Sequence, residues 1–271
     1  MIFQIKSYLK FYWNSKNEHG IHSPFVYDLV TKCFLNKTNY PEYEVLINYR
    51  KSLLENNKTI EVTDFGAGSR VFKSNIREVS KIAKNAGIRP KNAELLFRII
   101  QYFNPDTVLE IGTSLGLATS ALSLGNPNAK ITTLEGCPQT MEQCKLQLQK
   151  FNINNTNCVN TEFSSYFKNQ AQNTYNLIYF DGNHSKKATL EYFDLLLQTV
   201  TNESVWIFDD IHWSEDMEDA WESIKSHPKV TITIDTFQWG IVFFRKEQEK
   251  ENFIINPFKT FSSFIFEKIR L

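Results

Sequence analysis

Short apolar runs recur along residues 107–245, and most of them are separated by segments long enough to form a helix. Buried strands that alternate with helices are typical of an α/β fold, in which helices cover both faces of a mainly parallel sheet. Only Thr236–Gly240 separates the last two runs, which is too short for a crossover helix, so we expect the last strand to be antiparallel. The seven predicted strands are Thr107–Ile111, Lys130–Leu134, Asn157–Asn160, Leu177–Phe180, Val205–Phe208, Val230–Asp235 and Ile241–Arg245.

The part of the chain before this region lacks the alternation. Helical spacing of apolar side chains predicts helices at Ile2–Trp13 and Phe25–Phe34, so residues 1–87 are interpreted as an N-terminal helical extension that caps the ligand pocket. A further helix, Ala93–Phe103, carries an apolar stripe and leads directly into the first strand.

The C-terminal tail has a pattern of its own. Apolar residues in Phe253–Leu271 recur at helical spacing beside Lys259, Lys268 and Arg270, which predicts a short basic amphipathic helix. Such a helix can lie on a membrane, but packing on its own domain or on a second subunit is more common. The expected division of the chain is an N-terminal extension, a ligand-binding domain and a tail, at residues 1–87, 88–246 and 247–271.

The turn after the first predicted strand is the most informative motif. Glu110 ends the strand, and Gly112 and Gly116 form a Gly-x-x-x-Gly turn that opens a helix, so that the backbone can approach a ligand above the helix N-terminus. Glu135 ends the second strand, 19 residues beyond Gly116, where a carboxylate can accept both hydroxyls of a ribose. This spacing predicts a nucleoside site formed by Glu110, Gly112, Thr113, Ser114, Gly116 and Glu135.

A dinucleotide site is the nearest alternative. It would have Gly-x-Gly-x-x-Gly, in which the second glycine makes room for a pyrophosphate, and Ser114 occupies that position here. A nucleoside cofactor without phosphate, such as S-adenosylmethionine, needs only the glycine turn, and the hydroxyls and amides of Thr113 and Ser114 can bind its carboxylate. The motif therefore favours S-adenosylmethionine over NAD or a flavin.

A second glycine motif, Asp64-Phe65-Gly66-Ala67-Gly68, occurs upstream. It is followed by a basic, helix-like segment, Arg70–Gly87, with no second strand and no carboxylate at a strand end. We therefore interpret it as a turn or as a loop that folds over the active site, with ligand contact as the alternative.

Two further strand ends are acidic. Asp181 and His184 follow the fourth predicted strand, and Asp209 and Asp210 follow the fifth. Ligands of open parallel sheets bind beyond the carboxyl ends of the strands, and buried carboxylates are costly unless they pair or bind something. Three carboxylates at one rim are a candidate oxygen cage for Mg²⁺ or another divalent cation.

Through these motifs, the segment of residues 88–245 resembles the class I S-adenosylmethionine-dependent methyltransferases, a family with a Rossmann-like sheet of seven strands. It is similar in particular to the O-methyltransferase branch related to the catechol and caffeoyl-CoA enzymes. The resemblance implies that Asp181, Asp209 and Asp210 hold the cation, with Asp210 where the metal-dependent enzymes have Asn. It also implies a base at His184, where those enzymes have lysine, and cofactor contact by Asp181. Because a histidine can accept a hydroxyl proton near neutral pH, the chemistry survives this change.

Composition narrows the partners. Thirty basic and 30 acidic residues give a net charge of zero, which does not favour nucleic acid and leaves a small-molecule methyl acceptor. Four cysteines without zinc-site spacing and the lack of an apolar stretch of about 18 residues predict a cytoplasmic protein without stable membrane insertion. A homodimer, a catalytically silent cofactor-binding protein, and methylation of protein or nucleic acid stay open.

Overall fold

The computed structural model describes residues 2–16, 20–63, 74–169 and 173–258. Its main sheet has eight strands in the order β10-β8-β9-β7-β6-β3-β4-β5. In chain order they are β3 (Thr107–Ile111), β4 (Lys130–Glu135), β5 (Thr156–Asn160), β6 (Leu177–Phe180), β7 (Val205–Asp209), β8 (Ile232–Asp235), β9 (Trp239–Phe243) and β10 (Glu251–Ile254). All seven predicted strands are therefore confirmed, with ends that shift by one or two residues.

The pairing of the strands is also as predicted. The neighbours from β5 through β4, β3 and β6 to β7 are parallel, and β9 runs antiparallel to both β7 and β8. The crossover connections put the carboxyl ends of the parallel strands at one rim, which is where ligands bind in such sheets.

The tail differs from its prediction. Glu251–Ile254 is the edge strand β10, parallel to β8, and the bridge between Lys16 and Ile255 continues its contact toward the N-terminal segment. The helix expected over Phe253–Leu271 is therefore wrong at its start, because Phe253 is buried within a strand whose backbone pairs with β8. Residues 259–271 of that prediction lie outside the described residues.

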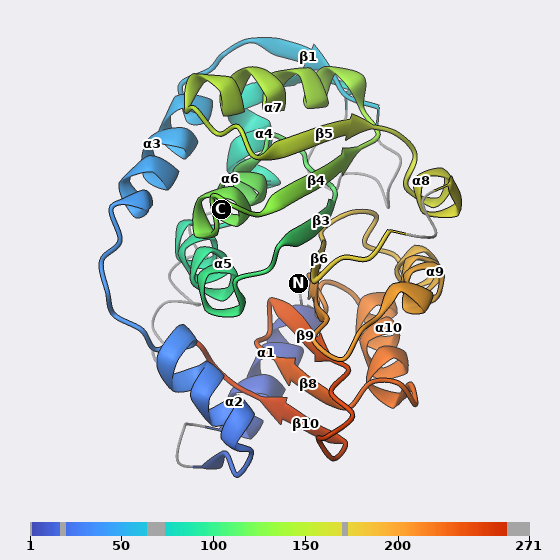
Figure 1. Cartoon of the computed structure of the whole chain (residues 1–271). Coiled ribbons are helices and arrows are strands. Elements are labelled where there is room, and N and C mark those ends of the chain that lie inside the picture. Colours follow the sequence, from blue (N-terminus) through green and yellow to red (C-terminus); the bar gives the residue numbers. More distant parts are fainter. Residues whose placement is uncertain (1, 17–19, 64–73, 170–172, 259–271) are drawn as a thin grey trace.

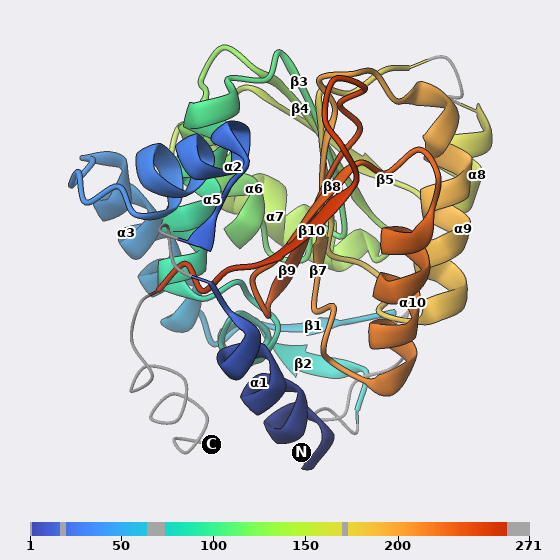
Figure 2. The same ribbon diagram turned by 90° about the horizontal axis from the view of Figure 1, so that it is seen from below.

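Helices cover both faces of the sheet (Figure 2). One face packs against α2 (Pro24–Leu29), the π-helical turn that extends it (Val30–Phe34), α5 (Pro90–Phe103) and α6 (Leu117–Gly125). The other packs against α8 (Phe163–Asn169), α9 (Lys186–Leu196) and α10 (Glu215–Ser226). Alternate strand residues face the two layers, as for Val108 and Leu109, because successive side chains of a strand point to opposite faces.

A third cluster lies beside the glycine turn. It joins α3 (Glu42–Leu54), α4 (Val79–Asn85) and α7 (Pro138–Lys150) to the start of α6, and Tyr49 is its largest fully buried side chain. Helices α3 and α4 of the N-terminal part thus pack beside the glycine turn.

The N-terminal extension is helical as predicted at α1 (Ile2–Asn14) and α2, but not throughout. A two-stranded antiparallel ribbon joins β1 (Thr59–Glu61) to β2 (Ile76–Glu78). The expectation of no strand in Arg70–Gly87 is therefore wrong at β2, whereas α4 confirms its helical part. The motif Asp64–Gly68 lies outside the described residues, and none of the described helices is long and apolar enough to cross a membrane.

Candidate active site

In the glycine turn between β3 and α6, every second residue has a positive φ. Gly112, Ser114 and Gly116 have φ values of 100°, 48° and 76°, and the amides of Gly112 and Thr113 both donate to the carbonyl of Leu134. A Cβ on Gly112 would lie 2.2 Å from the backbone oxygen of Asp181. Gly112 is therefore required for the close approach of two strand-end loops, which is a different reason from the ligand clearance expected from the sequence.

The N-terminus of α6 lies directly after this turn. Gly116 is its N-cap residue and has no side chain with which to cap the helix, so among the described residues the first amides of α6 are a candidate site for an anionic group such as a carboxylate. A narrow cleft of about 10 Å³ above them is lined on the sheet side by Thr113, Ser114 and Asp181. Its opposite wall comes from α4, including Ile82 and Ala83, which the sequence analysis did not identify because they are ordinary apolar helix residues.

Glu135 is held at the end of β4 by backbone amides. Its two carboxylate oxygens accept from Ser114 N (2.8 Å) and from Cys137 N (2.9 Å), and the side chain is only half-buried. These two bonds fix the orientation of the carboxylate at the strand end, where it can act as an acceptor for hydroxyl groups. Ribose binding by Glu135 stays a prediction, and this geometry suits it.

Glu110 lies beneath the turn and is fully buried. One carboxyl oxygen accepts from the hydroxyls of Thr119 and Thr133, and Thr133 is in turn paired with the hydroxyl of Thr113. Burial raises the pKa of Glu110 to about 8, and its other oxygen is without a hydrogen-bond partner among the described residues. Glu110 thus supports the turn through Thr133 and Thr113, and direct contact with a cofactor stays a prediction.

The acidic residues after β6 and β7 do come together. Asp181 and Asp209 are hydrogen-bonded to each other, and Asp210 lies within electrostatic range of both. His184 Nε2 is 3.5 Å from Asp181 Oδ1. Burial, followed by the charge of Asp209, raises the pKa of Asp181 well above its ordinary value.

Gln238, in the turn between β8 and β9, completes this cluster. Its Nε2 donates to Oδ1 of Asp209 and to Oδ1 of Asp210, each at 2.7 Å. The two N–H groups of Gln238 therefore occupy one oxygen of each carboxylate, Oδ1 of Asp209 and Oδ1 of Asp210. No group of three or more histidine, cysteine or acidic residues among those described is arranged to hold a metal, so the predicted donor set does not fit a cation in this arrangement.

His212 belongs to a separate network behind the cluster. Its Nε2 is 2.8 Å from Asp235 Oδ2 and its Nδ1 is 3.3 Å from Glu218 Oε2, while its ring stacks on Phe237. Burial lowers the pKa of His212, but the two carboxylates outweigh burial and raise it to about 9. His212 is therefore a buried cation that fixes the turn containing Gln238, a role that its position after the two aspartates did not reveal.

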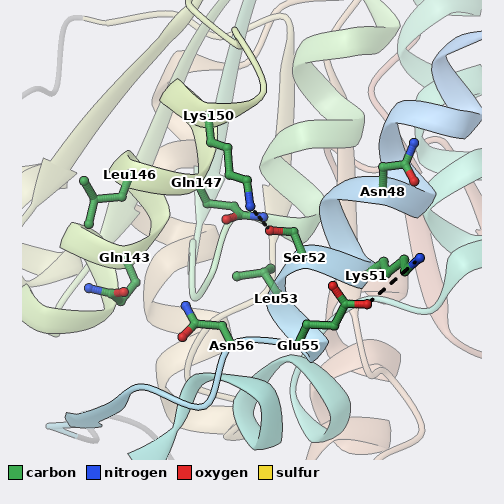
Figure 3. Close-up of a pocket in the computed structure, with 10 residues that line it drawn as sticks. All are labelled: Asn48, Lys51, Ser52, Leu53, Glu55, Asn56, Gln143, Leu146, Gln147 and Lys150. Carbon is green, nitrogen blue, oxygen red and sulfur yellow. Dashed lines mark hydrogen bonds and ion pairs between the residues drawn. The ribbon is translucent and has the colours of Figure 1, made fainter.

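A second hollow, of about 580 Å³, lies between α3 and α7 (Figure 3). Its polar wall includes Lys51, Ser52 and Lys150, and Lys150 Nζ contacts Ser52 Oγ. It shares no residue with the glycine turn or the acidic cluster, so we assign it no part in the candidate site.

Comparison with known proteins agrees with this arrangement. Residues 109–211 match the family model described as "Methyltransferase domain", a span that runs from β3 past the acidic strand ends. No curated protein matches the chain.

Several solved structures share the fold. An S-adenosylhomocysteine-bound methyltransferase from Podospora anserina, PaMTH1, is 12% identical with a TM-score of 0.59, over 83% of this chain and 97% of that one. A putative caffeoyl-CoA O-methyltransferase from Staphylococcus aureus is 16% identical with a TM-score of 0.53, over 61% and 88%. The O-methyltransferase TomG from Streptomyces achromogenes, in complex with S-adenosylmethionine, is 12% identical with a TM-score of 0.54, over 80% and 95%. At these identities the likeness establishes the fold.

Proposed function

This chain contains a methyltransferase domain in the fold of the class I O-methyltransferases, and on that premise we propose that it transfers the methyl group of S-adenosylmethionine to a hydroxyl oxygen of a small molecule. The observation that carries the proposal is the convergence of three features at one rim of the sheet. They are the uncapped N-terminus of α6, the oriented carboxylate of Glu135, and the cluster of Asp181 with His184.

The chain's own residues suit the parts of this cofactor. The amides at the start of α6 would bind its carboxylate and Glu135 its ribose hydroxyls, with Gly112 keeping the two strand-end loops in contact. When bound, S-adenosylmethionine supplies a methyl group already activated on a sulfonium, so that the main work of the protein is to position the acceptor.

His184 is the residue we assign to proton removal. It is partly exposed, with 27% of its side chain accessible, and it lies beside Asp181. Asp181 Oδ1 is close enough to Nε2 to orient the imidazole ring, and the other ring nitrogen, Nδ1, can then accept the proton of an acceptor hydroxyl. Because Gln238 donates to Oδ1 of Asp209 and to Oδ1 of Asp210, proton removal is assigned to His184 without a cation.

The test combines cofactor binding with turnover. We expect calorimetry to show binding of S-adenosylmethionine and S-adenosylhomocysteine but not of NAD. A screen of catechols, phenols and sugar hydroxyls, read out as S-adenosylhomocysteine formed, should then identify an acceptor. The variant His184→Gln should keep cofactor affinity and lose roughly 10²–10⁴-fold in rate.

Three results would each change the proposal. If the His184→Gln variant keeps the wild-type rate on the best acceptor, His184 is not the base. Cofactor binding without methylation of any acceptor would favour a silent binding protein. Activity that is lost in EDTA and restored by Mg²⁺ would show that a cation displaces Gln238 from the carboxylates.

A further inference from the structure

Helix α1 has two faces that are both apolar. Its inner face is buried against the domain through Ser7, Tyr8 and Phe11. On its outer face the side chains of Ile2, Ile5, Leu9 and Trp13 are 73%, 51%, 45% and 80% exposed. These four residues follow helical spacing and form one continuous stripe, whereas a surface helix normally presents polar residues outward.

The inner face alone accounts for the docking of α1. Tyr8 and Phe11 pack on Phe237 with ring centroids 4.9 Å and 5.5 Å apart, and Ser7 Oγ donates to Glu218. Gln4 Nε2 also donates to the carbonyl of Trp213. The outer stripe therefore contributes nothing to these contacts, and Figure 2 shows α1 at the periphery of the molecule.

The charge beside the stripe indicates what it binds. Lys6 and Lys10 lie along one flank of it, Lys16 follows the helix, and α1 contains no acidic residue. Lys10 lies 3.6 Å from Glu218, but its side chain stays 72% exposed. An apolar stripe with exposed tryptophan and flanking lysines is complementary to a membrane surface of anionic lipid.

The same charge disfavours the two other occupants. Two copies of α1 packed stripe to stripe would bring their lysines together without an acidic partner on either helix. The second alternative occupant is the segment of residues 259–271. It carries Lys259, Lys268 and Arg270 and a single acidic residue, Glu267, so it offers little negative charge to the lysines of α1.

We propose that α1 is an interfacial helix that docks this protein on anionic lipid bilayers. Its stripe enters the boundary between headgroups and acyl chains, and its lysines contact the lipid phosphates. This surface lies on the opposite face of α1 from Phe237, whose neighbour Gln238 contacts the acidic cluster. The inference is independent of the methyl-transfer chemistry.

The experiment is vesicle binding by the full-length chain. Vesicles of phosphatidylcholine with phosphatidylglycerol should bind the protein in co-sedimentation, and should protect Trp13 from acrylamide, whereas pure phosphatidylcholine should not. A subtraction with Trp13→Phe isolates this signal from the other four tryptophans. High salt should weaken binding through screening, and Lys6→Gln should reduce affinity by about fivefold.

Leu9→Glu tests the stripe itself. We expect this variant to reduce vesicle affinity by roughly tenfold or more, because it removes an apolar side chain that would enter the bilayer and adds an anion. The matched control is Leu146→Glu on α7, where the replaced leucine is 51% exposed, and it should bind vesicles as the wild type does. Circular dichroism of both variants should match that of the wild type, which checks that they fold.

Other results overturn the proposal. Failure to bind anionic vesicles, or equal loss in the control, would refute it directly. A dimer in sedimentation velocity that Leu9→Glu dissociates would assign the stripe to a second copy. Trp13 already protected from acrylamide in monomeric protein without vesicles would assign it to another part of this chain.

Discussion

Replacing His212 by glutamine should destabilise the fold at neutral pH, and the effect should fade in alkali. The imidazole is buried between Asp235 and Glu218 and touches Phe237. Glutamine has a similar length and can donate one hydrogen bond, but it lacks the charge. The substitution therefore leaves two carboxylates without their shared cation.

The magnitude follows from the pKa of the histidine. It rises from an ordinary 6.5 to about 9, and each unit is worth about 1.4 kcal/mol, so the charged form contributes on the order of 3 kcal/mol to the free energy of unfolding. Because the folded-state pKa is raised, this contribution is complete below pH 6.5 and is lost as the pH rises toward 9. The lowered pKa of Glu218, about 2, reflects the same interaction and is not added.

Urea denaturation at pH 6.0, 7.5 and 10 measures this dependence. The wild type should exceed His212→Gln by about 2–3 kcal/mol at pH 6.0 and by much less at pH 10. His22, which is exposed, provides the matched control His22→Gln, expected to change stability by less than about 0.5 kcal/mol. A difference between wild type and variant that is independent of pH would show that His212 is held by packing and not by its charge.

Three further predictions concern the glycine turn. Glu135→Ala should weaken S-adenosylmethionine binding by about 1–3 kcal/mol in calorimetry, and unchanged affinity would remove Glu135 from the ribose site. Gly112→Ala should destabilise the fold by on the order of 3 kcal/mol, because its Cβ would meet the Asp181 backbone, whereas Gly20→Ala has only ordinary contacts at 3.5 Å and should be tolerated. Glu110→Gln should be at least as stable as the wild type at pH 8 in thermal melts. The folded-state pKa of Glu110 is raised to about 8, so the stability of the wild type falls as the pH rises from about 4.5 to 8. A strongly destabilised variant would show that the fold needs the ionised carboxylate.

The sheet was predictable because its signals are local. Each strand of the parallel part is a short apolar run. The predicted gap of five residues before the last strand, which is residues 236–238 in the structure, permitted only an antiparallel return. The strand β10 could not be predicted in the same way. Phe253 fits a helical and an extended pattern equally, and only pairing with β8 decides between them.

The acidic site was predictable only in part. The rule that parallel strands end at a common rim placed Asp181 beside Asp209, and the structure confirms this proximity. The partner that satisfies the carboxylates, Gln238, comes from a turn 28 and 29 residues beyond Asp210 and Asp209 and belongs to no motif. The sequence therefore located the carboxylates but not the amide that donates hydrogen bonds to them.

The turn between β8 and β9 connects the N-terminal helix to the acidic cluster. Phe237 adopts a φ of 71°, a strained conformation for an aromatic residue, and its amide donates to Asp235 Oδ1 while Tyr8 and Phe11 pack on its ring. Those contacts must offset the strain. Because the next residue is Gln238, the packing of α1 on Phe237 supports the turn from which the side-chain amide reaches Asp209. Helix α1 of the N-terminal extension therefore packs on the turn that supplies the hydrogen-bond donor of the acidic cluster.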